Sequence, residues 1–306
     1  MQTVQLLGHL LTLFILPVLL LCVSILPLLP LVWILHRRKK VYKSEAEDPF
    51  TQLPLRPPGE SLRLRIEELS DELATHLFGL CMAGALSVTV RVVMPDNVRW
   101  HTAGAMLVVM TGTTLIEGRK ILRLVRELWD HRLGFTGERV VGEELNQLLA
   151  AGFRVFHDVP FENKGKKFNI DHVLVGPHGV FAVETKTRRK PSDVKGLAKA
   201  KVFSDGERLQ FPKYTETDSI AQARRNAATL GSWLSQAIGE PVKANAILTI
   251  PGWSVERTKP CDVNVLRPDE IKRSFVRPNV PFNEQKIQRI AHQLTNRCQM
   301  TKEMAG

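Results

Sequence analysis

Three consecutive stretches in the middle of the chain decide its fold: FNIDHVLV at 168–175, GPHG at 176–179 and VFAVETK at 180–186. The first and third are rich in β-branched and aromatic residues, which indicates two strands. The glycine-bounded stretch between them predicts a tight turn. If Gly176 pairs with Gly179, the same register places Asp171 directly opposite Glu184.

This pairing would bring two acids together on one surface. Facing residues of an antiparallel pair share a face of the sheet, with Cβ atoms about 5 Å apart. Two carboxylates placed in this way repel unless a cation lies between them, and Mg²⁺ prefers oxygen ligands. Strand alternation also puts Lys186 on the face of Glu184. The pattern therefore predicts a metal site at Asp171 and Glu184; the competing interpretation is an exposed hairpin with a cross-strand salt bridge.

The surrounding sequence predicts an α/β domain with a mixed central sheet flanked by helices. We expect this domain at 129–255, followed by a C-terminal strand and helices at 256–306. Helical spacing of apolar residues predicts helices, and short apolar runs predict strands. The expected helices are 137–151, 218–238 and short ones from Pro268 and Asn283, and the further strands are 153–159, 242–250 and 263–266.

The central motifs resemble a known family. Ile170-Asp171-His172, the Gly-x-Phe of 179–181 and Val183-Glu184-Thr185-Lys186 are similar to the NERD (nuclease-related) domain. That family resembles the wider PD-(D/E)xK nucleases, so the resemblance implies a restriction-endonuclease-like fold. The likeness runs from about Gly134 to Ile250. It also implies a nuclease that depends on Mg²⁺ or Mn²⁺.

The resemblance assigns roles to four neighbouring residues. Asp171 and Glu184 would hold the metal, and the backbone carbonyl of Thr185 would be a further ligand. Lys186 would act on the attacking water. The basic segment that follows departs from many relatives, which are aromatic and glycine-rich there, so substrate contacts stay open.

Two helical positions complete the expected site. The family's first motif is a helical glutamate, which Glu138 matches best; Glu144 is a second candidate on a different face of the helix. A later helix of the family carries a glutamine, which Gln222 matches, with Asn226 one turn further on. The resemblance therefore adds Glu138 and Gln222 to the candidate catalytic residues.

The N-terminal part of the chain predicts a membrane anchor. Residues 1–36 are apolar and long enough to cross a bilayer, and they lack the basic start of a signal peptide. Residues 37–70 form a basic, proline-rich linker. Residues 71–128 predict a transmembrane hairpin and a basic exit helix, although two buried helices of a soluble bundle would fit the same pattern. Basic flanks place the linker and the C-terminal domain on the cytoplasmic side of an inner or plasma membrane.

The overall charge favours an anionic partner. The 306 residues carry a formal net charge of +11, which suits nucleic acid or an anionic membrane face. The four cysteines are scattered without C-x-x-C spacing, so no zinc site is expected. Basic residues gather after the hairpin, and such clusters bind phosphate backbones or merely coat a solvated surface; they are Arg188, Arg189, Lys190, Lys195, Lys199, Lys201, Arg224 and Arg225.

Three functions are compatible with these patterns. The favoured one is metal-dependent phosphodiester hydrolysis of nucleic acid, with DNA as the expected substrate, by a membrane-tethered cytoplasmic endonuclease. The second is a nucleic-acid-binding or scaffolding module that keeps the fold without turnover. The third is a structural membrane protein whose basic loops bind anionic lipids. The complete set of two acids and a lysine favours the first.

Overall fold

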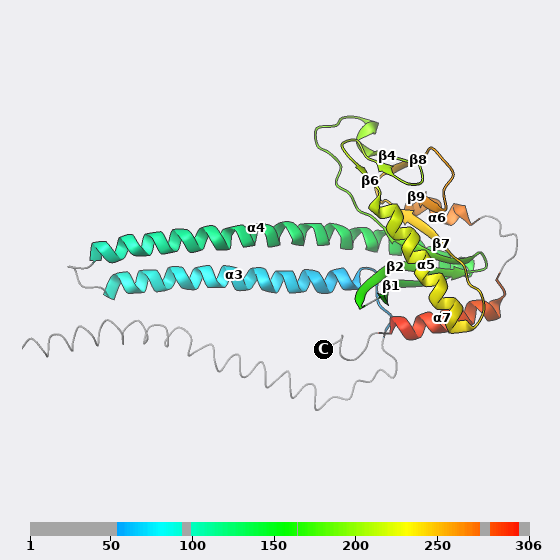
Figure 1. Ribbon diagram of the computed structural model, residues 1–306, viewed down its shortest axis with the longest axis horizontal. Coiled ribbons are helices and arrows are strands. Elements are labelled where there is room, and N and C mark those ends of the chain that lie inside the picture. The colour runs from blue at the N-terminus through cyan, green and yellow to red at the C-terminus, as the bar shows by residue number, and fades with distance from the viewer. Residues whose placement is uncertain (1–53, 94–98, 164, 276–281, 300–306) are drawn as a thin grey trace, which may run out of the picture. The chain divides into compact units, whose positions relative to one another are not determined.

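The computed structural model describes residues 54–93, 99–163, 165–275 and 282–299 (Figure 1). These residues belong to two compact units. The first contains the described part of 68–128, and the second contains that of 52–67 and 129–306. Helices α3 (Glu60–Val93) and α4 (Arg99–Asn146) each run from one unit into the other.

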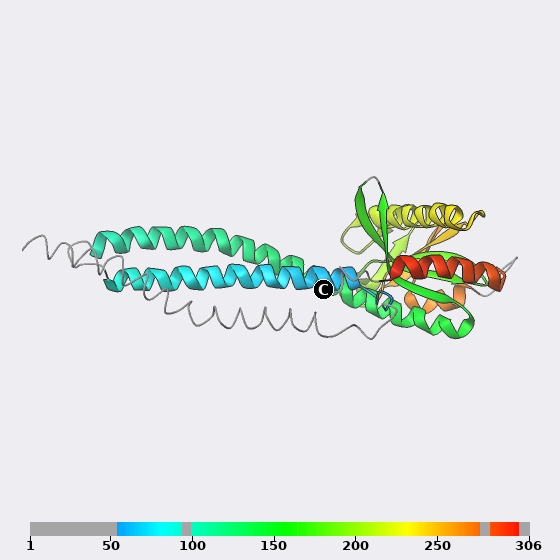
Figure 2. The same ribbon diagram turned by 90° about the horizontal axis from the view of Figure 1, so that it is seen from below.

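The first unit is a pair of antiparallel helices, which lie side by side in Figures 1 and 2. His76 on α3 contacts Glu117 on α4, with 2.6 Å between Nδ1 and Oε2. Glu117 also pairs with Lys120, one turn further along α4, at 2.9 Å. Two helices therefore occupy the region in which the sequence predicts a hairpin.

The predicted membrane crossing of this hairpin is not supported. Within the described residues, no helix is both long and apolar enough to cross a bilayer. In α4 the apolar run is interrupted by small and polar residues such as Gly104, Thr111 and Thr113. The predicted anchor at 1–36 and the first half of the linker lie outside the described residues. The linker also ends earlier than expected, because α3 begins at Glu60.

The second unit is built on a five-stranded mixed sheet, as the sequence predicts. Its strand order is β1-β2-β3-β7-β9. The first three strands are antiparallel neighbours, whereas β3, β7 and β9 run parallel. Their bounds are β1 (Arg154–Asn163), β2 (Lys166–Gly176), β3 (Gly179–Thr185), β7 (Ala244–Thr249) and β9 (Val263–Leu266).

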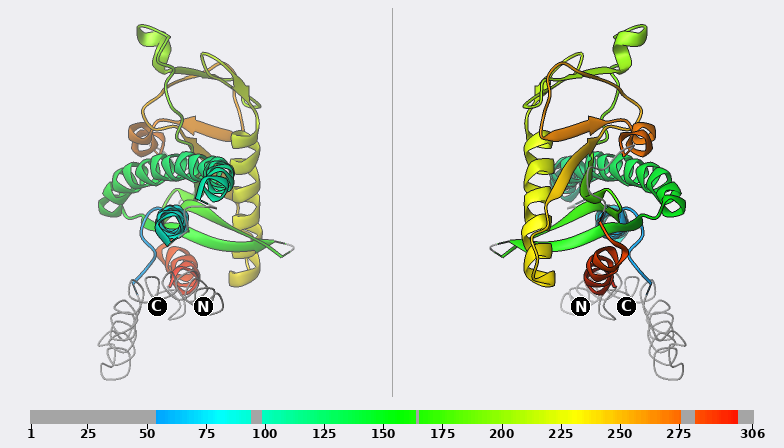
Figure 3. Two further views of the ribbon diagram at one scale, coloured as in Figure 1. Left: turned by 90° about the vertical axis from the view of Figure 1, so that its left-hand side faces the viewer. Right: turned by 90° about the vertical axis from the view of Figure 1, so that its right-hand side faces the viewer.

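Helices cover both faces of this sheet (Figures 2 and 3). Val180 and Ala182 of β3 join a core with α5 (Asp218–Ile238) and α7 (Glu284–Cys298). Phe181 and Val183 point to the opposite face, where they pack with the end of α4, η1 (Gln147–Ala151) and α6 (Pro268–Ser274). Because both faces are buried, β3 is apolar along nearly its whole length.

The helix expected at 137–151 is not a separate element. It is the last part of α4, which begins at Arg99 and continues without a break to Asn146 before η1. The change in composition near Trp129 marks a boundary between compact units but not the start of a helix.

A second, four-stranded sheet was not predicted from the sequence. Its strand order is β6-β5-β4-β8. The segment between β3 and α5 supplies η2 (Leu197–Ala200), β4 (Lys201–Ser204), β5 (Leu209–Gln210) and β6 (Thr215–Glu216), and β8 (Ser254–Arg257) follows β7. Strands of two to four residues are too short to show an alternating pattern.

Candidate active site

The register of β2 and β3 is the one predicted from the glycine-bounded turn. Gly176 pairs with Gly179, and the ladder continues to His172 opposite Val183. The next position in this register places Asp171 opposite Glu184. Asp171 is held there by the backbone of β3, because its Oδ2 accepts a hydrogen bond from the Thr185 N–H at 2.7 Å.

Glu184 lies at the centre of the cluster and is only 1% exposed. Its Oε1 pairs with Nζ of Lys186 at 2.7 Å. Its Oε2 accepts a hydrogen bond from Nδ2 of Asn226, a buried residue of α5, at 2.8 Å. Burial raises the pKa of Glu184, against the opposing effects of Lys186 and Asn226. The side chain is therefore fixed from both sides.

Asp171 and Lys186 have electrostatic environments that depend on each other. Burial raises the pKa of Asp171 well above its usual range, and the charges of Glu184 and Glu138 add to the effect. Burial alone would lower the pKa of Lys186, but the neighbouring carboxylates outweigh it and raise the pKa. Lys186 is thus kept as a cation beside acids that repel one another.

Glu138 approaches the same cluster from α4. The neighbouring Gly137 lies so close to Thr187 that a Cβ on the glycine would stand 2.2 Å from the threonine Cγ2. This contact brings α4 against the segment that leaves β3. Burial, followed by the charges of Asp158 and Glu184, raises the pKa of Glu138 to about 8. Of the two helical glutamates considered, Glu138 is the one whose pKa is raised by the neighbouring acids.

The other candidate positions lie outside the cluster. Glu144 is a partner of Gln147, whose Nε2 donates to it at 3.1 Å. Gln222 is half-buried in α5 one turn before Asn226, and within the described residues no hydrogen bond joins it to the acids. The helix therefore presents an amide to Glu184, but from Asn226. The family resemblance selected Gln222 on this helix, whereas the hydrogen bond to Glu184 comes from Asn226, one turn further on.

A third acid on the next strand was missed by the sequence. Asp158 of β1 is the position that faces Asp171, because its neighbours His157 and Val159 pair with His172 and Ile170. Its backbone has φ +49, the left-handed region that aspartate tolerates better than most residues. No local pattern signals this conformation.

Asp158 is 1% exposed and is surrounded by donors. The guanidinium of Arg56 lies 2.8 Å from its Oδ2. Ser61 donates its backbone N–H at 3.1 Å and its hydroxyl at 2.6 Å, and Asn169 donates its amide at 2.9 Å. The residues before and at the start of α3 are thus anchored on β1 beside the acids.

Strand alternation is interrupted at this row in both strands. In β1, Phe156 and Val159 contribute to the same core, although they are three positions apart. In β2, Ile170 and Val173 do the same. Regular alternation would put each pair on opposite faces. The irregularity occurs at the same level in both strands, so the register between β1 and β2 is the same before and after it. Only the backbone around Asp158 and Asp171 departs from regular strand geometry.

A buried histidine pair lies next to the acids. Nδ1 of His157 and Nδ1 of His172 are 2.8 Å apart, and Nε2 of His157 lies 3.2 Å from Oδ1 of Asn146. Burial lowers the pKa of His157 to about 4 and that of His172 well below its usual value. Both rings are therefore neutral near pH 7, and their pairing makes them packing residues rather than metal ligands.

The part of the chain that carries these residues matches a known protein family. Residues 133–251 match the NERD family, described as a nuclease-related domain. The NERD segment covers less than half of the chain; it begins in α4 and ends just after β7. It includes Glu138, Asp171, Glu184, Lys186 and Asn226, but not the β8 strand. No curated protein and no solved structure matches the chain.

The donor set of the NERD segment suits a hard divalent cation. Within the described residues, no group of three His, Cys, Asp or Glu side chains is arranged to hold a metal ion. The expected set is smaller: two carboxylates and the carbonyl of Thr185. Carboxylate and carbonyl oxygens fit Mg²⁺ or Mn²⁺. Burial raises the pKa of both Asp171 and Glu184, and the charge of Glu184 adds to the effect at Asp171. A bound cation would offset both effects by favouring the ionised carboxylates.

Proposed function

We propose that this protein hydrolyses phosphodiester bonds of nucleic acid, with DNA as the expected substrate, in a reaction that requires Mg²⁺ or Mn²⁺. The observation that carries the proposal is the contact of Lys186 with Glu184 at 2.7 Å, beside Asp171 in the facing position. The match of residues 133–251 to a nuclease-related domain supports it. The likeness to PD-(D/E)xK nucleases belongs to the same proposal.

Asp171, Glu184 and the carbonyl of Thr185 are the groups that would hold the metal. A bound divalent ion supplies Lewis-acid stabilisation of charge on the phosphate and lowers the pKa of a bound water. Asn226 fixes one oxygen of Glu184 and so orients the carboxylate. Asp171 is oriented in the same way by the Thr185 N–H.

Lys186 contributes a positive charge rather than a base. Its pKa is raised, so Nζ carries three protons at neutral pH. An ammonium group in this place can donate hydrogen bonds to a water and to a phosphate oxygen. In the reaction the water oxygen gives up a proton to the solvent and bonds to phosphorus, the bond from phosphorus to the leaving oxygen breaks, and the leaving oxygen takes up a proton.

Glu138 completes the site with a protonated carboxyl. Its pKa of about 8 means that it is largely uncharged at pH 7. A neutral carboxyl can donate a hydrogen bond to water or phosphate, whereas a carboxylate would repel the anionic substrate. The site thus combines two carboxyl groups that would hold the metal with two groups that favour an incoming phosphate.

The test is cleavage of plasmid DNA by the full chain with Mg²⁺ or Mn²⁺. Replacing Lys186 by Ala removes one charge-stabilising donor, so we expect cleavage to fall about 100- to 1000-fold. Lys190→Ala is the matched control, because this exposed lysine lies four residues further on; it should change cleavage less than about threefold. Unchanged cleavage by Lys186→Ala would remove catalysis from this site.

A binding function without turnover is the second candidate. Both oxygens of Glu184 already have partners in Lys186 and Asn226, and the ammonium of Lys186 would repel a metal ion at Oε1, so this contact would have to loosen to admit one. If the contacts never loosen, the domain would bind nucleic acid and not cleave it. Salt-sensitive DNA binding that survives Asp171→Asn, together with no metal-dependent cleavage by the wild type, would favour this candidate.

A further inference from the structure

The four-stranded sheet has one buried face and one open face. Val202 and Leu209 lie in the main core of the second unit. On the opposite face Phe203 of β4 is 38% exposed. Phe203 pairs with Gln210 on one side and Glu256 on the other, and Gln210 pairs with Thr215. One row of side chains therefore crosses all four strands, with an aromatic ring near its middle.

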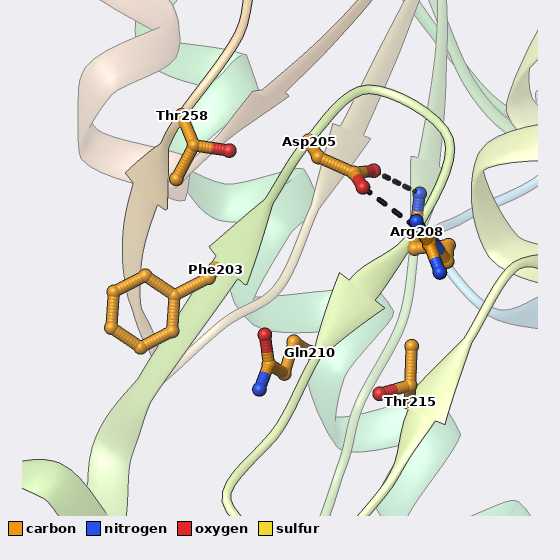
Figure 4. Close-up of a pocket in the computed structure, with 6 residues that line it drawn as sticks. All are labelled: Phe203, Asp205, Arg208, Gln210, Thr215 and Thr258. Atoms are coloured by element: carbon orange, nitrogen blue, oxygen red, sulfur yellow. Dashed lines mark hydrogen bonds and ion pairs between the residues drawn. The ribbon is translucent and has the colours of Figure 1, made fainter.

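This face forms a cavity of about 500 Å³ (Figure 4). The figure shows the Gln210 amide and the Thr215 hydroxyl beside the space that Phe203 and Thr258 border. Within the described part of the chain, the side chains of Gln210 and Thr215 make no hydrogen bond. Their donors and acceptors are thus available to a ligand next to an exposed ring.

The acids on this face each have a basic partner within the protein, and for Asp205 it is Arg208, whose Nε lies 3.4 Å from Oδ2. Asp205 accepts hydrogen bonds from the backbone N–H groups of Glu207 and Arg208, at 3.0 and 2.7 Å. Glu256 pairs with Nζ of Lys201 at 2.5 Å. The stretch 187–216, which builds most of the sheet, holds eight Lys or Arg residues against four Asp or Glu. Its net charge is complementary to a phosphate backbone.

We propose that this open face binds single-stranded nucleic acid, with an unpaired base stacked on the ring of Phe203. The inference rests on the proposed function for its choice of ligand, and it names the class of substrate. Aromatic rings stack on any base, because every base has a π-face. Amide and hydroxyl groups such as those of Gln210 and Thr215 hydrogen-bond the edges of splayed bases. The bases of an intact duplex are already stacked and cannot reach the ring.

The open face is joined to the acids by the segment that leaves β3. Arg188, two residues after Lys186, binds Glu216 of β6 through two guanidinium nitrogens, at 2.9 to 3.1 Å. Its carbonyl accepts a hydrogen bond from Nε1 of Trp253, directly before β8, at 3.0 Å. Both outer strands of the small sheet are thereby tied to one point of the chain beside the site. A single strand of nucleic acid bound on this face would therefore lie on the same compact unit as Glu184.

The test is fluorescence anisotropy of the full chain with labelled oligothymidine and with a labelled duplex, both in EDTA to prevent cleavage. Phe203→Ala should weaken oligothymidine binding about tenfold, the loss expected for one stacked base, and duplex binding less than about twofold. Phe203→Trp should restore the wild-type affinity, because a larger ring stacks at least as well.

Two controls separate this inference from the proposed function. Leu197→Ala removes another exposed apolar side chain of the same segment and should leave both affinities unchanged. Lys186→Ala should lose cleavage and keep oligothymidine binding. Cleavage that persists in Lys186→Ala would overturn the proposed function alone. Equal losses for oligothymidine and duplex, or wild-type binding by a folded Phe203→Ala protein, would overturn the inference.

Discussion

Asp158 and Asp171 face each other on neighbouring strands, yet their surroundings are opposite. Asp158 receives hydrogen bonds from Ser61 and Asn169 and an ion pair from Arg56. Asp171 receives one backbone hydrogen bond and lies beside two further acids. The first carboxylate is satisfied by the protein itself. The carboxylate of Asp171 is repelled by its neighbouring acids, and a bound cation would offset this repulsion. This difference is the one expected between a structural residue and a binding residue.

The largest expected effect is on stability when each aspartate is replaced by asparagine. Asp158→Asn leaves Arg56 as a buried charge without its partner, so we expect a loss of about 3 kcal/mol or more in the free energy of unfolding. Asp171→Asn removes a repelling charge and should change it by less than about 1 kcal/mol. Urea unfolding in EDTA measures both. Equal losses would erase the distinction between the two residues.

The next effect is the pH dependence caused by Glu138. Its pKa is about 8 in the folded protein and 4.5 as the ordinary value, so the folded state binds the proton more tightly. The contribution of this group to stability is therefore fully present below about pH 4.5 and is lost as the pH rises through about 8. Glu138→Gln should flatten this slope, by on the order of 2–4 kcal/mol across the window.

Measuring the free energy of unfolding from pH 5 to pH 8.5 in EDTA checks this expectation. The histidine pair titrates in the opposite sense and gives an internal contrast. Because the folded pKa of His157 is about 4, its contribution is present above about pH 6.5 and is lost as the pH falls through about 4. An unaltered alkaline slope in Glu138→Gln would show that another group is responsible.

Divalent ions should stabilise the protein through one aspartate only. At a concentration about 100 times the dissociation constant, a bound ion adds about 2.7 kcal/mol. We expect Mg²⁺ or Mn²⁺ to raise the melting temperature of the wild type at pH 7.5 and to leave that of Asp171→Asn unchanged. A Ser61→Ala variant, which weakens only the support of Asp158, should still respond. A response retained by Asp171→Asn would place the ion elsewhere.

The smallest effect separates two amides of α5. Asn226→Ala removes the hydrogen bond to Oε2 of Glu184, so we expect a loss of roughly 1–2 kcal/mol in stability. Gln222→Ala, one turn away, should cost less than about 0.5 kcal/mol. Thermal unfolding of the two variants side by side makes the measurement. A larger loss of stability in Gln222→Ala than in Asn226→Ala would instead favour Gln222, the residue that the family resemblance selected.

The sequence predicted those features that depend on neighbours along the chain. The glycines of the turn set the register of β2 and β3, and this register placed Asp171 opposite Glu184. The mixed sheet followed from the order of helical and strand-like segments. Glu138 was selected by family likeness, and it is buried near the acids.

Features that depend on distant contacts could not be predicted in this way. Arg56 and Asp158 are about 100 residues apart in the chain, and nothing near either residue signals the other. Asp158 has φ +49 inside strand β1, where no turn motif announces such a conformation. The strands of the four-stranded sheet are too short to show an alternating pattern. The basic charge of the stretch 187–216 was therefore the only feature that the sequence revealed there. The length of α4 was missed because the change in composition near Trp129 was interpreted as the start of a separate domain.

The turn between β2 and β3 has a consequence for how this chain can diverge. Pro177 and His178 occupy it, and each contacts other parts of the protein: the Pro177 carbonyl accepts from the Phe282 N–H, and His178 stacks on Phe153. These contacts are replaceable, whereas the spacing between the two acids is not. A residue gained or lost between Asp171 and Glu184 would turn one of them to the opposite face. Substitutions in the turn should therefore be tolerated during evolution, whereas insertions and deletions should be selected against.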